Sequence, residues 1–131
     1  IRYMCIICEK EPGSHSFEYR GKNSNLVNIY YSCPAKATKY WDTKGIIAHY
    51  KELLDENNHQ PWSWYFDSTG FGFVHSLEIA TALGLVALLK EHNDSLQSIH
   101  IIYPTIYIKA LYNIIKPFLT SDLIKKIDWM L

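Results

Sequence analysis

The sequence predicts an α/β domain in which helices flank a mainly parallel sheet, and two observations lead to this prediction. The segment 62–67 is almost continuously aromatic or apolar, stops at Asp67 and runs into a glycine-spaced turn. A strand of this kind is usually covered on both faces by crossover helices, so we expect a three-layer domain. Strand-like and helix-like segments also alternate from residue 26 onward. Such alternation predicts right-handed crossovers between parallel strands.

Length and composition describe one domain and exclude some partners. The chain has 131 residues, with 48% hydrophobic and 20% charged residues, as expected of a globular protein. Its formal net charge is zero, whereas nucleic acid binding needs clustered positive charge, so we expect no nucleic acid partner. The longest apolar run, residues 79–89, is too short to cross a bilayer, which leaves at most peripheral membrane contact. Three cysteines without a secretory signal predict a reduced, cytoplasmic protein.

The first 25 residues differ from the rest, and we expect them to form an N-terminal arm or hairpin (1–25) ahead of the main domain (26–131). A short apolar segment, Tyr3–Cys8, precedes a polar stretch and has the composition of a strand. Pairing of Tyr3–Cys8 with Ser16–Arg20 would make the hairpin. The main domain then opens with a strand from Leu26 to Ser32.

Two helices and the central strand come next. Asp42 or Thr43 is the expected cap of a helix that runs to about Glu56 and carries one apolar stripe. The strand 62–67 follows a turn. His75 or Ser76 is then expected to start a second helix that ends near His92.

The C-terminal third repeats this order. Ser98–Tyr103 is a predicted strand, and Pro104 suits the first turn of the helix that follows, through Phe118. A short helix over 121–126 and the start of a fourth strand at 128–131 complete the prediction.

The sequence contains few candidates for metal binding or catalysis. Cys5 and Cys8 are spaced like zinc ligands, with His15 or Cys33 as further candidates. We expect no metal site and no cofactor, because a second ligand pair at the standard spacing is absent and a β-strand would point the two cysteines to opposite faces. A nucleophile elbow, a phosphate loop and paired catalytic carboxylates are also missing, so we expect no enzyme. We interpret Asp67 as a turn residue that accepts hydrogen bonds from its own loop.

Four segments together resemble the CRAL-TRIO domain family, which has a lipid-exchange fold. They are 29–31 with Pro34 and Ala35, 64–72 with His75, 99–103 with Pro104, and 116–119 with 125–127. The segment 103–109 is nearer the divergent BCH branch of that superfamily. The resemblance covers residues 26–131 and implies a CRAL-TRIO-like fold that is C-terminally short, since the family continues through another strand and more helix.

The resemblance implies a non-enzymatic module that binds a phospholipid or another apolar ligand. In the family, the helix after the third strand is a gate over an apolar cavity, and here that helix is 105–118. The ligand would lie between the sheet and this helix. The residues expected to line its site are Ile106, Tyr107, Ala110, Leu111, Ile114 and Phe118.

The alternative is a BCH-like module for protein interaction or self-association that keeps the fold without a lipid cavity. The BCH branch is associated with small GTPases and regulatory partners. In this case an exposed sheet edge and the N-terminal arm would pair with a protein partner or with a second copy in a homodimer.

Overall fold

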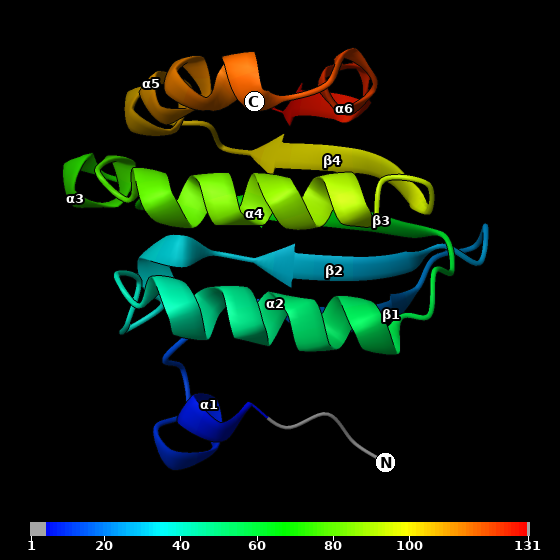
Figure 1. Cartoon of the computed structure of the whole chain (residues 1–131), viewed down its shortest axis with the longest axis horizontal. Coiled ribbons are helices and arrows are strands. Elements are labelled where there is room, and N and C mark those ends of the chain that lie inside the picture. The colour runs from blue at the N-terminus through cyan, green and yellow to red at the C-terminus, as the bar shows by residue number, and fades with distance from the viewer. Residues whose placement is uncertain (1–4, 131) are drawn as a thin grey trace.

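The computed structural model describes residues 5–130, which form one five-stranded sheet in the order β1-β2-β3-β4-β5 (Figure 1). The strands are β1 (Glu18–Lys22), β2 (Asn28–Ser32), β3 (Trp62–Asp67), β4 (Leu96–Ile102) and β5 (Ile127–Met130). β1 pairs with β2 in antiparallel orientation, and every other neighbouring pair is parallel. The prediction of an α/β fold with a mainly parallel sheet is confirmed.

The helices follow the predicted alternation with one difference. They are α1 (Ile6–Lys10), α2 (Thr43–Glu56), α3 (Phe73–Ser76), α4 (Ile79–Glu91), α5 (Ile106–Ile115) and α6 (Ser121–Lys126), with the short 3-10 helices η1 (Pro34–Lys36) and η2 (Lys116–Phe118). The single helix expected from 75 or 76 to 92 is two helices, because the backbone at Glu78 has ψ 58°, outside the helical region. No helix within residues 5–130 combines the length and hydrophobicity needed to span a bilayer.

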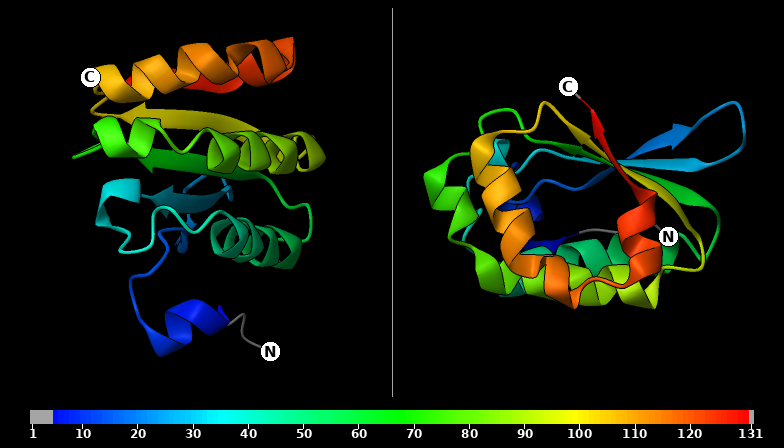
Figure 2. Two further views of the ribbon diagram at one scale, coloured as in Figure 1. Left: turned by 60° about the vertical axis from the view of Figure 1, so that its left-hand side comes forward. Right: turned by 90° about the horizontal axis from the view of Figure 1, so that it is seen from above.

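The domain has two layers, so the expectation of three is wrong. Figure 2 (right) shows α2, α4, α5 and α6 on one side of the sheet. The strands stand in the sheet in the order in which they occur in the sequence, so each parallel strand lies on the same side of the preceding one. Right-handed crossovers between such strands all pass over the same face of the sheet. The other face carries the alternate side chains of each strand, among them Tyr31 and Tyr65. The sequence could not show that this face is uncovered, because its tyrosines count with the aromatic and apolar positions of the predicted strands.

The N-terminal segment is also arranged differently from the prediction. Cys8 lies in α1 and not in a strand, since the Glu9 N–H donates to the Cys5 carbonyl at 2.8 Å and closes a helical turn. Tyr3 lies outside the described residues. The hairpin of the structure joins β1 to β2, and Asn23 Oδ1 stabilises its turn by accepting hydrogen bonds from the N–H groups of Asn25 and Val27.

The core lies between the sheet and α2 and α4. Trp62 and Trp64 of β3 are buried, and each indole N–H donates to a buried serine: Trp62 to Ser95 at 3.1 Å and Trp64 to Ser32 at 2.7 Å. The start of α2 is fixed by Asp42, whose side chain accepts a hydrogen bond from the Gly45 N–H, as the predicted cap requires. A second, smaller core cluster contains Phe71, Ile108 and Leu111 and places α5 over the sheet.

Candidate functional site

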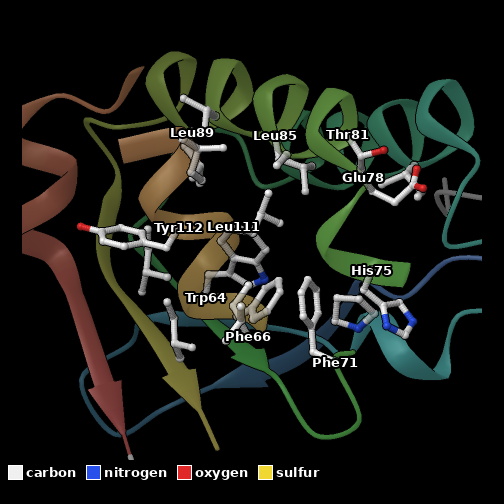
Figure 3. A pocket seen from close by; sticks show the side chains of 18 of the residues that line it. Trp64, Phe66, Phe71, His75, Glu78, Thr81, Leu85, Leu89, Leu111 and Tyr112 are labelled. Carbon is white, nitrogen blue, oxygen red and sulfur yellow. The ribbon is translucent and has the colours of Figure 1, made fainter. Parts of the chain in front are cut away.

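An apolar cavity of about 150 Å³ lies between the helix-covered face of the sheet and helices α4 and α5 (Figure 3). The sheet contributes Trp64, Phe66, Ile99 and Ile101, α4 contributes Ala82, Leu85, Val86 and Leu89, and α5 contributes Ile108, Leu111, Tyr112 and Ile115. Its lining is almost wholly apolar, so the cavity suits a hydrocarbon group and offers little to a charged ligand.

A few polar groups collect at the end of the cavity near α3. Phe71, His75, Glu78 and Thr81 line this end. His75 Nδ1 accepts a hydrogen bond from the Gly72 N–H at 3.0 Å, and burial lowers the pKa of His75 below its ordinary value. The imidazole is therefore neutral near pH 7, with its remaining proton on Nε2. This end of the cavity can orient a ligand that has one polar group and an apolar remainder.

The six residues expected to line the site are not brought together around this cavity. Leu111 lines it. The other five are outside its lining and exposed, with Ile106 the most exposed at 72%. Those five are Ile106, Tyr107, Ala110, Ile114 and Phe118.

The reason for this difference is that α5 is apolar around most of its circumference. A second apolar stripe, spaced at i, i+3, i+4 and i+7, consists of Ile108, Leu111, Tyr112 and Ile115. Its helical spacing is as regular as that of the stripe chosen from the sequence. The sequence reasoning missed this second stripe, and periodicity alone cannot rank two overlapping stripes. Leu111 is the one residue common to both.

Asp67 has the role expected from the sequence. Its Oδ1 accepts hydrogen bonds from the Thr69 N–H at 3.0 Å and the Thr69 hydroxyl at 2.6 Å. The Tyr31 hydroxyl also donates to Asp67 Oδ2 at 2.6 Å across the open face of the sheet. These contacts stabilise the turn that leads to the cavity, and they occupy both carboxylate oxygens.

The open face of the sheet also carries a polar chain that sequence reasoning missed. Ser98 Oγ lies 2.9 Å from His100 Nε2, and His100 Nδ1 lies 3.1 Å from Asp128 Oδ2. Ser63 Oγ lies 2.8 Å from Ser98 Oγ. The order of groups is that of a hydrolase triad, but none of these residues lines the apolar cavity, which opens from the other face. We assign the chain no catalytic role.

The fold and its cavity define an α/β domain of CRAL-TRIO-like architecture. The solved structure of Sfh5, a Sec14-like CRAL-TRIO protein, superposes on it with a TM-score of 0.71 at 10% sequence identity. The match covers 98% of this chain and 52% of Sfh5, so the chain spans about half the length of that protein. At this identity the similarity establishes the fold alone. No protein-family sequence model and no curated protein sequence matches the chain.

Proposed function

We propose that this chain is a non-enzymatic binding module for an apolar ligand, of the lipid type. The observation that carries the proposal is the apolar cavity between the sheet and α5. A cavity of about 150 Å³ holds one benzene-sized group, whereas ligand pockets usually measure about 300–1,000 Å³. Admission of an acyl chain therefore requires α5 to move away from the sheet.

The contacts that hold α5 support such a movement. The helix packs on the sheet through Ile108 and Leu111, and Tyr112 lies edge-on to Trp129 with ring centroids 5.0 Å apart. Apolar contacts have no fixed direction, so a hydrocarbon chain can replace them at little cost. A polar tie exists at the N-terminus, where the Thr105 hydroxyl donates to the Phe71 carbonyl at 2.8 Å. We propose that this end acts as the hinge of the gate.

The outer surface of α5 and α3 supports peripheral contact with a membrane. We call this surface the outer patch; its exposed members are Phe73, Val74 and Leu77 from α3 and the loop after it, and Ile106, Tyr107, Ile114 and Phe118 from α5 and η2. The rings of Phe73 and Tyr107 lie 6.3 Å apart and join the two helices. Large exposed apolar patches mark interaction surfaces, and this one lies on the helix that must move. We propose that the outer patch meets the lipid surface during exchange.

A pair of substitutions on α4 tests the cavity as the binding site. Ala82→Phe would fill the cavity from its α4 side, whereas Ala87→Phe places the same ring on an exposed position of the same helix. We expect uptake of a fluorescent phospholipid from vesicles by the wild type and by Ala87→Phe, and at least a tenfold loss for Ala82→Phe. Equal uptake by both variants would place the ligand elsewhere.

The outer patch also keeps the alternative open, since an exposed apolar surface fits a protein partner as well as a lipid. In that case Ala82→Phe should leave binding of the partner unchanged, because the cavity takes no part in it. The cavity-filling pair therefore separates the two functions.

A further inference from the structure

Four candidate metal ligands from three separate segments of the chain lie close together in the structure. Cys5 and Cys8 come from the start of α1, His15 from the loop before β1, and His49 from the middle of α2. Their ligand atoms all lie within 4.8 Å of one another. In Figure 1, α1 lies below α2 and precedes the strands of the sheet in the chain.

The distances within this cluster are those of a tetrahedral zinc site. His15 Nδ1 lies 3.6 Å from Cys5 Sγ and 3.7 Å from Cys8 Sγ, and His49 Nδ1 lies 3.6 Å from Cys8 Sγ. Zinc bonds of about 2.3 Å to sulfur and about 2.0–2.1 Å to nitrogen, at a tetrahedral angle, place a sulfur and a nitrogen about 3.5 Å apart. The three sulfur–nitrogen separations given above match this value, and the other ligand atoms lie within 4.8 Å of one another.

The second nitrogen of each histidine has the partner that a zinc site requires. His15 Nε2 lies 2.9 Å from the Asp42 carboxylate, and His49 Nε2 lies 2.8 Å from the Phe17 carbonyl. Both acceptors hold the ring proton on Nε2, so each Nδ1 presents its lone pair to the centre of the cluster. Gly45 belongs to this arrangement too, because a Cβ at that position would collide with the Asp42 carboxylate and with His15.

One of the two arguments against zinc from the sequence was a strand at Cys5–Cys8, and that premise is wrong. In a helical turn, residues three apart lie on the same side, which lets both sulfur atoms reach one point. The missing second pair is supplied by His15 and His49, which are 34 residues apart by their numbers and have no recognisable spacing. Only the fold brings them together, because the loop before β1 places His15 beside Asp42 at the start of α2.

We propose that Cys5, Cys8, His15 and His49 bind one Zn²⁺ ion in a structural site that fastens the N-terminal arm to α2. Two thiolates and two neutral imidazoles neutralise the ion, and each cysteine loses one proton on binding. Four protein ligands complete the tetrahedron and leave no position for a substrate, so the site is structural and not catalytic. It is separate from the apolar cavity, since none of its four ligands lines that cavity.

Metal analysis of the purified chain tests the proposal. We expect one zinc per chain by elemental mass spectrometry after dialysis against zinc-free buffer, and none in Cys8→Ser. Cys33→Ser is the matched control, because Cys33 is a buried free cysteine whose thiol faces the Thr69 carbonyl, outside the cluster. This control should keep its zinc.

Cobalt substitution tests the same site without any variant. The wild type, stripped of metal and titrated with Co²⁺ alone, should develop the visible bands of tetrahedral cobalt and a thiolate charge-transfer band, saturating at one equivalent. A wild type that binds neither ion would overturn the proposal. So would a stable Cys5–Cys8 disulfide, seen as a mass lower by two hydrogen atoms in a chain purified under reducing conditions.

Discussion

At the scale of single residues, a serine hydroxyl satisfies the indole N–H of Trp64 in the core. Ser32 is fully buried and accepts that hydrogen bond at 2.7 Å. Ser32→Ala would leave a buried donor unpaired, so we expect a loss of about 1–3 kcal/mol in the free energy of unfolding, measured by urea denaturation. Ser68→Ala is the matched control, since Ser68 is equally buried and its hydroxyl has no hydrogen-bond partner among the described residues. A loss of the same size in both variants would contradict this explanation.

The hydrogen bonds that Asp67 accepts determine how the free energy of unfolding should depend on pH. Burial alone would raise the pKa of the Asp67 carboxyl, but hydrogen bonds from Thr69 and Tyr31 outweigh it, and the pKa is lowered. A lowered pKa in the folded state adds stability above the unfolded pKa of about 3.9, and that stability is lost as the pH falls through the folded value. Asp67→Asn should therefore be less stable than the wild type at neutral pH.

The difference between the two proteins should shrink on acidification below about pH 4, because the wild-type carboxyl becomes neutral as well. Urea denaturation at a series of pH values measures this. A stability difference that stays constant from neutral pH to about pH 3 would show that ionisation of Asp67 contributes nothing.

At the scale of elements, α5 shows what periodicity can and cannot predict. Its existence follows from the sequence, but Pro104 lies before the cap at Thr105 and not in the first turn of the helix, as the sequence had suggested. The face that it turns to the sheet could not be predicted, because Ile108 and Ile106 are equally apolar and belong to two competing stripes. The tertiary contacts with Phe71 and Trp129 decide between them.

The outer patch on α5 gives a prediction about membrane contact. Ile106 is 72% exposed at the first position of the helix, where an acidic side chain suits the helix dipole. Ile106→Asp should therefore fold normally and reduce sedimentation with phospholipid vesicles several-fold. Leu26→Asp is the control, since Leu26 is 71% exposed in the β1–β2 turn, away from α5. Equal losses in both variants would mean that the outer patch is not the membrane-facing surface.

The β1–β2 hairpin shows why local signals located the N-terminal elements poorly. The strand predicted at Ser16–Arg20 overlaps β1, but the sequence paired it with Tyr3–Cys8, whereas in the structure β1 pairs with β2. The bulge between Tyr19 and Lys22, with Gly21 at φ 85°, bends this edge strand. A charged, bent edge is a poor template for pairing with a second copy.

At the scale of the whole molecule, the sequence predicted the order of the elements well. β3 has the predicted bounds, and α2 begins after the expected cap at Asp42. The number of layers could not be predicted, because it depends on the order of the strands in the sheet and on which face each crossover takes. The contact between Cys8 and His49, which are 41 residues apart in the sequence, depends on the same long-range packing.

The division into an arm (1–25) and a main domain (26–131) remains a prediction. In the structure its boundary falls within the turn that joins β1 to β2, so the arm contributes a strand to the sheet of the main domain. If the four-ligand zinc site forms as proposed, the arm is attached to the main domain at two places.

The most direct test of the central claim, that the cavity under α5 holds an apolar ligand, is native mass spectrometry of the wild-type chain after incubation with phospholipid vesicles. The account predicts an added lipid mass at one per chain, released by organic extraction. A chain that emerges with no added mass, while remaining folded by circular dichroism, would contradict it and leave protein interaction as the function of this fold.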